Sequence, residues 1–102
     1  MSFESKNKFI SEKEFNERTE DFTGIILIRD SSIHQMFESY LEKLVPGKYQ
    51  VFDLKFLDEK LNTKLPINLG INMFKYKNGT LLDHKNVMLG YVALKEWLRD
   101  II

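Results

Sequence analysis

The segment from residue 24 to residue 44, GIILIRDSSIHQMFESYLEKL, constrains the fold more than any other part of this chain. Residues 24–29 form an apolar run of strand length that ends at Asp30, which indicates a central strand covered on both faces. The apolar residues that follow recur at intervals of three and four, which is typical of one face of a helix; they are Ile33, Met36, Phe37, Tyr40, Leu41 and Leu44. Residues 49–57 are again strand-like, so the chain contains a βαβ unit, whose crossover is expected to be right-handed.

Local signals predict the remaining elements. Residues 8–10 predict a short first strand, and Ser11-x-x-Glu14 has the form of a capping box, which starts a helix that ends near residues 22–24. Residues 58–64 predict a short helix or a turn. Residues 71–84 predict a β-hairpin, because Asn78-Gly79 supplies the two positive-φ positions of a type I′ turn. The last helix is amphipathic, and its residues available for burial are Val92, Leu94, Trp97, Leu98 and Ile101.

The predicted order β-α-β-α-β-α-β-β-α describes an α/β fold, with a five-stranded mixed sheet and helices on both faces. A chain of 102 residues is long enough for one hydrophobic core, so we expect a single domain over residues 1–102, with 1–7 as a flexible N-terminus. The expected core includes Ile26, Ile28, Phe37, Leu41, Val51, Leu54, Phe74 and Trp97.

Composition excludes several classes of function. Fifteen basic residues balance 15 acidic ones, so no long-range field attracts nucleic acid or an anionic membrane. The chain has no cysteine, which excludes dithiol exchange, thiolate nucleophiles and iron–sulfur ligation. No apolar run approaches the ~18 residues of a membrane span, and we expect a cytoplasmic protein. The candidate metal ligands His34, His84, Asp30 and Asp83 share no known ligand spacing, so we expect no metal and no other cofactor.

Ser31, Ser32, Ile33 and His34 lie where the central strand meets the helix. Ser31 and His34 could form a catalytic pair, but a serine nucleophile also needs a group that orients its base. The two serines are favoured helix N-caps, and Ser32-x-x-Gln35 has the form of a capping box. We therefore favour a helix cap, with non-thiol chemistry at Ser31 and His34 as the alternative.

Asp53 interrupts an otherwise apolar strand. We favour an aspartate near a strand edge that faces solvent, because buried charges are rare unless they are paired.

The last third of the chain, FKYKNGTLLDH followed by LKEWLRDII, resembles the C-terminal hairpin and helix of members of the thioredoxin family. The resemblance as a whole extends from Phe9 to Ile102. It implies a thioredoxin-like fold in which Ser31 and His34 occupy the positions of the two cysteines of the Cys-x-x-Cys motif. Ile71 falls on the position of the family's cis-proline. Because a cis bond before a non-proline residue costs about 2.5–4 kcal/mol, we expect Gly70–Ile71 to be trans. Val87 replaces a glycine of the family. The family often buries a lysine near the position of Asp53, opposite an acidic residue of the neighbouring strand, so the resemblance implies an alternative for Asp53, an ion pair with Arg29 in which the two charges are exchanged.

These departures imply a redox-inactive protein that binds a protein or peptide partner, as an accessory or chaperone-like module. A link to a bacterial peptide-export or bacteriocin system is a further expectation from the family. The family's peptide groove falls on Ser31 to Ile33 and on Gly70, Ile71, Asn72, Val87 and Met88. Extended peptide would pair with the strand end at residues 70–72. In the competing hypothesis, Ile33, Ile71 and Met88 collapse on one another and close the groove.

A structural subunit is the remaining alternative. It would form a homodimer through the second strand of the hairpin or through the apolar surface near Ile71.

Overall fold

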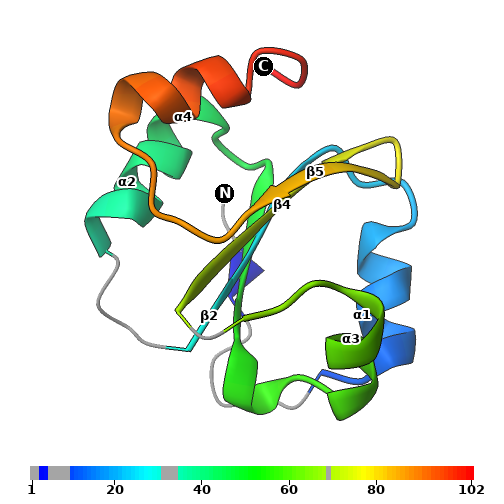
Figure 1. Cartoon of the computed structure of the whole chain (residues 1–102). Helices are drawn as coiled ribbons and strands as arrows, with labels where there is room; N and C mark the ends of the chain where they lie inside the picture. The colour runs from blue at the N-terminus through cyan, green and yellow to red at the C-terminus, as the bar shows by residue number, and fades with distance from the viewer. Residues whose placement is uncertain (1–2, 5–9, 31–34, 69) are drawn as a thin grey trace.

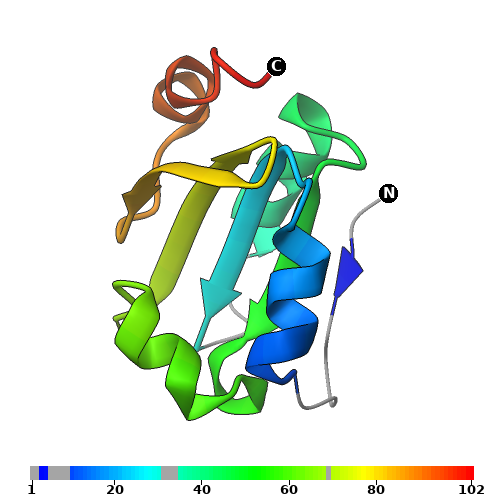
Figure 2. The same ribbon diagram turned by 90° about the vertical axis from the view of Figure 1, so that its right-hand side faces the viewer.

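The computed structural model describes residues 3–4, 10–30, 35–68 and 70–102. Its sheet has the strand order β1-β3-β2-β4-β5, as Figures 1 and 2 show. Strands β1, β3 and β2 are parallel to one another, whereas β4 is antiparallel to both β2 and β5. The strands are β1 Phe3–Glu4, β2 Gly24–Arg29, β3 Tyr49–Asp53, β4 Ile71–Lys77 and β5 Thr80–Lys85. The sheet is therefore mixed and consists of four longer strands and a two-residue strand, β1, beside β3.

Helices cover both faces of the sheet (Figure 1). They are α1 Glu12–Thr19, α2 Gln35–Leu44, α3 Glu59–Lys64 and α4 Tyr91–Trp97, with a 3-10 turn at Leu54–Phe56. One core cluster lies between the sheet and the helices α2 and α4; it includes Ile25, Leu27, Phe37, Leu41, Val51, Ile71, Met73, Leu94 and Leu98. The other lies on the side of α1 and α3; it includes Ile10, Phe15, Ile26, Ile28, Phe52, Leu61 and Phe74. The expected α/β architecture with helices on both faces is confirmed.

Several local predictions are confirmed as well. Every residue of β2 is buried, as expected for a central strand. The Ser11 hydroxyl accepts a hydrogen bond from the Glu14 backbone N–H at 3.1 Å and caps α1. The Gly70–Ile71 peptide bond is trans. The predicted core residues are buried except Leu54 and Trp97, which pack against the two clusters while partly exposed.

The first part of the chain differs from the prediction. Residues 8 and 9 of the expected first strand lie outside the described residues, and Ile10 forms an isolated parallel bridge with Leu57. The first strand of the sheet is Phe3–Glu4 instead, which lies within the segment expected to be flexible. Helix α1 ends at Thr19 rather than near residues 22–24, because the Phe22 N–H turns back to the Thr19 carbonyl at 3.2 Å.

Two further elements correct the sequence prediction. Strand β3 ends at Asp53 instead of running to Leu57, because the next three residues form a 3-10 turn. In α4, Val92 is 75% exposed although it was expected to be available for burial. Leu94 and Leu98 are four residues apart and share the inward face of the helix, which leaves Val92 on the outward face.

The turn between β4 and β5 yields a first prediction. Gly79 has φ +82°, and a Cβ atom at this residue would lie 1.9 Å from the Glu20 carbonyl oxygen. We expect Gly79→Ala to lower the free energy of unfolding by about 1–3 kcal/mol, measured by urea denaturation, because the turn must distort. Gly90→Ala is the matched control, since nothing lies within 4 Å of its Cβ position, and it should cost under about 1 kcal/mol. Equal losses in the two variants would contradict the prediction.

Candidate functional site

An apolar groove lies where α2 meets the segment that leads into α4. Figure 1 shows where α2 and α4 lie in the fold. Its volume is about 250 Å³, and its lining residues are Met36, Phe37, Tyr40, Met88, Leu89 and Gly90. We call it the α2/α4 groove. Only Phe37 among its large side chains is fully buried, so the floor of the groove belongs to the core and its walls are accessible.

Large apolar side chains remain exposed along this groove. Met36 is 70% exposed and Met88 is 55% exposed, and the neighbouring Val87 is 59% exposed. The rings of Tyr40 and Tyr91 meet edge to face with centroids 5.4 Å apart, which joins α2 to the start of α4. Scattered exposed apolar residues are normal, but a contiguous apolar patch on a folded domain marks an interaction surface. Methionine suits such a surface because its side chain adapts to different partners.

The sequence of α2 explains this exposure. Phe37 and Leu41 are four residues apart and point into the core. Met36 and Tyr40 each precede one of these inward residues, so they lie at the side of the helix. The sequence placed Met36 on the same apolar face as Phe37 and Leu41, and Met36 is nevertheless exposed, because the apolar stripe is wider than the face that the sheet covers.

The structure separates the residues of the predicted peptide groove. Ile71 is 5% exposed and packs in the core cluster beneath α2. Asn72 is fully buried, and its side chain lies on the opposite face of the sheet, beside Phe74. Neither side chain is available to a partner, which corrects their expected place at the surface. Val87 and Met88 are exposed, and Met88 lines the α2/α4 groove.

The backbone of Gly70 is also occupied. Its N–H donates to the Asp30 carboxylate at 2.7 Å, and its carbonyl accepts from the Asp30 N–H at 3.0 Å. An incoming peptide cannot use the Gly70 N–H without displacing the Asp30 carboxylate, and it would share the Gly70 carbonyl with the Asp30 N–H. The expected pairing of a peptide at Gly70 is therefore not supported by the structure.

The side chain of Asn72 fixes the chain that precedes β4. Its amide nitrogen donates to the carbonyls of Ile28 at 3.2 Å and Asn68 at 2.8 Å. Its oxygen accepts from the Asn68 N–H at 2.8 Å and from the side chain of Asn86 at 2.9 Å. These bonds satisfy a fully buried amide, so Asn72 has a structural role.

Arg29 forms a buried ionic cluster below α2. Its side chain is 2% exposed and pairs with Glu38 of α2 and, at 3.2 Å, with Asp53 of β3. Alternation along β2 puts Arg29 on the same face as Leu27, where α2 covers the sheet. The interpretation of Asp53 as a solvent-facing residue was wrong, and the ion pair with Arg29 is correct. The register of β2 on β3 aligns Arg29 with Asp53 and produces this pair.

The arrangement of these elements is similar to that of solved thioredoxins. A mutant thioredoxin from Halobacterium salinarum NRC-1 matches with a TM-score of 0.69 and 13% sequence identity, over 98% of this chain and 89% of that chain. Thioredoxin from Plasmodium falciparum matches with a TM-score of 0.66 and 16% sequence identity, over 93% of this chain and 99% of that chain. Thioredoxin from Trypanosoma brucei brucei matches with a TM-score of 0.63 and 18% sequence identity, over 92% of this chain and 90% of that chain.

The chain has a thioredoxin-like fold. Identities this low show the fold alone. No model of a protein family matches the sequence, and no curated protein sequence matches it. This thioredoxin-like chain contains no cysteine, so it cannot carry out thiol–disulfide exchange with groups of its own.

The positions that resemble the family's two cysteines, Ser31 and His34, lie outside the described residues together with Ser32 and Ile33. The choice between a helix cap and a catalytic pair at Ser31 and His34 therefore stays a prediction. Tyr40, Leu89 and Tyr91 belong to the site although no sequence pattern had assigned them to it. A signal for Leu89 and Tyr91 was present, because LGY immediately follows the predicted groove residues Val87 and Met88, whereas Tyr40 lies in α2, far from them in the sequence.

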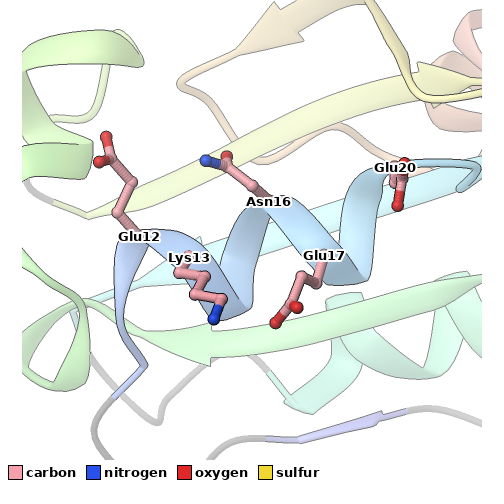
Figure 3. A pocket seen from close by; sticks show the side chains of 5 residues that line it. All are labelled: Glu12, Lys13, Asn16, Glu17 and Glu20. Carbon is pink, nitrogen blue, oxygen red and sulfur yellow. The ribbon is translucent and has the colours of Figure 1, made fainter.

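A second hollow lies along the outer surface of α1 (Figure 3). Its lining residues, Glu12, Lys13, Asn16, Glu17 and Glu20, all belong to this helix or its C-terminal end. The hollow is therefore an open, charged helix surface, and the Glu12 carboxylate forms an ion pair with Lys64 of α3 at 2.5 Å. We assign no site to it.

Two negative findings concern only the described part of this thioredoxin-like chain. No group of three His, Cys, Asp or Glu side chains there could hold a metal ion. No helix there is long and apolar enough to cross a membrane.

Proposed function

We propose that this chain is a redox-inactive thioredoxin-like protein that binds a peptide or protein segment in the α2/α4 groove. The exposure of Met36 and Met88 on the two sides of one apolar pocket is the observation that carries the proposal. The absence of cysteine supports a binding role over a redox role. On this proposal the protein is not an enzyme.

The groove suits side-chain recognition. A volume of about 250 Å³ is sufficient for one or two apolar side chains of a partner, which would displace water from Tyr40 and the two methionines. Because Asp30 occupies both backbone groups of Gly70, burial of side chains contributes more to this binding than main-chain pairing at that strand end.

The biological setting of the proposal rests on the resemblance to the thioredoxin family. It comprises a cytoplasmic location, an accessory or chaperone-like role, and a link to a bacterial peptide-export or bacteriocin system. A homodimeric subunit and a non-thiol enzyme at Ser31 and His34 remain the alternatives.

Selection from a library of random peptides tests the proposal. We expect the wild-type protein to enrich peptides with large apolar side chains, and Met36→Asp or Met88→Asp to weaken their binding at least tenfold, since about 1.4 kcal/mol of apolar contact is lost. The Tm of both variants should stay near that of the wild type, because both side chains are mostly in solvent.

Ile102→Asp provides the matched control. Ile102 is 53% exposed, similar to Met88, but it does not line the groove. This variant should bind the selected peptides like the wild type. Peptides that bind all three aspartate variants equally well would contradict a site in the α2/α4 groove.

A further inference from the structure

Strand β5 forms one edge of the sheet, so its outer side is open to another strand. Leu81 and Leu82 on this strand are 37% and 43% exposed. An edge strand with exposed apolar residues is a template for pairing with a second copy of the same chain. The structure contains two features that oppose such pairing.

The first feature is the carboxylate of Asp83. One of its oxygens accepts the backbone N–H of His84 at 2.8 Å, and the other accepts the indole N–H of Trp97 at 2.9 Å. A backbone N–H that already donates to a side chain is not available to a new strand. The bond from Trp97, followed by that from His84, lowers the pKa of Asp83, so the carboxylate is an acceptor at neutral pH.

Trp97 is itself held in place from the sheet. The Nζ atom of Lys75 donates to the Trp97 carbonyl at 2.8 Å and to the Asp100 carboxylate at 2.9 Å. The same Nζ atom lies 5.1 Å from the centroid of the Trp97 ring. Lys75 of β4 lies directly opposite Asp83 of β5 in the register of the two strands. Asp83 therefore accepts a hydrogen bond from a donor on α4 that Lys75 holds in place, and this bond fixes the Asp83 carboxylate.

The second feature is an irregularity in the edge strand. Tyr76 of β4 aligns with Leu81, but the preceding Lys75 aligns with Asp83, so Leu82 is an extra residue in β5. A bulge of this kind bends the strand and interrupts its hydrogen-bonding pattern. The part of β5 that remains regular is Asp83 to Lys85. In this part, the Asp83 carboxylate accepts the hydrogen bond from the His84 N–H.

We propose that the Asp83 carboxylate, held by Trp97 and bonded to the His84 N–H, closes the β5 edge and prevents this chain from pairing with a second copy through β5. In the absence of this carboxylate, the His84 N–H becomes available and two β5 edges can pair symmetrically.

Sedimentation velocity of Asp83→Ala tests the inference. The wild-type protein should sediment as a monomer. The average mass of the variant should rise with protein concentration toward twice the mass of one chain. Lys85→Ala is the matched control, because it removes one charge from the same strand and leaves Asp83 intact; this variant should sediment like the wild type. Association of both variants, or of neither, would overturn the proposal.

Two further measurements keep the proposal testable if Asp83→Ala folds poorly. Hydrogen exchange of the wild-type protein should show a protected His84 amide, and exchange at the rate of an unbonded amide would overturn the proposal. In the double variant Asp83→Ala with His84→Pro, proline has no N–H to offer, so the protein should return to the wild-type mass. Continued association of the double variant would also count against Asp83 as the closing group.

Discussion

Replacement of Arg29 by alanine is expected to lower the free energy of unfolding by about 3–5 kcal/mol, the range found when one partner of a buried ion pair is removed. Arg29 is 2% exposed and lies between the carboxylates of Glu38 and Asp53. Without its guanidinium group, two partly buried carboxylates remain without their cation, and α2 loses an ionic link to the sheet. Urea denaturation measures the loss.

Arg99→Ala is the control for the Arg29 variant. Arg99 also pairs with a carboxylate, Glu96, at 3.1 Å, but its side chain is 75% exposed. Solvent screens such a pair, so this variant should change the free energy of unfolding by less than about 0.5 kcal/mol. A loss below about 1 kcal/mol in Arg29→Ala would show that the buried cluster contributes little to stability.

Ile71→Asp is expected to destabilise the protein by more than about 3 kcal/mol, because it puts a carboxylate into the core without a partner. Ile71 is 5% exposed and lies in the cluster with Phe37 and Met73. Thermal unfolding followed by circular dichroism should show a marked decrease in Tm or an unfolded variant.

Met88→Asp is the matched comparison for this position. It makes the same chemical change at a residue that is 55% exposed, so its Tm should stay close to that of the wild type. If Ile71→Asp were as stable as Met88→Asp, Ile71 would be a surface residue, as the hypothesis of an open groove at residues 70–72 requires. Ile71 lies in the core, but Met88 is 55% exposed and Ile33 lies outside the described residues, so the hypothesis that these three side chains collapse on one another stays a prediction.

The prediction of β4 and β5 succeeded because its signals are local. Asn78 and Gly79 have φ angles of +52° and +82°, as a type I′ turn requires. The Ser11 cap of α1 and the continuous apolar run of β2 are also encoded by neighbouring residues. Such features depend on conformational preferences over a few residues, so a sequence specifies them without knowledge of the rest of the fold.

The candidate site was predicted less well, because exposure depends on which element covers a side chain. Periodicity assigned Met36 to the apolar side of α2, but the sheet covers only the side that carries Phe37 and Leu41. The resemblance to the thioredoxin family also suggested an open strand end at Gly70, where Asp30 from a distant part of the sequence binds both backbone groups.

By itself, the sequence determined the order of most elements and excluded thiol chemistry, because periodicity, turn residues and the lack of cysteine are properties of the chain. Only the tertiary structure decided that Arg29 meets Asp53, that Ile71 is buried, and that Met36 and Met88 line one groove. The physical reason is that these contacts join segments far apart in the sequence. They depend on the register of β2 on β3 and on the packing of α2 and α4, which no local pattern encodes.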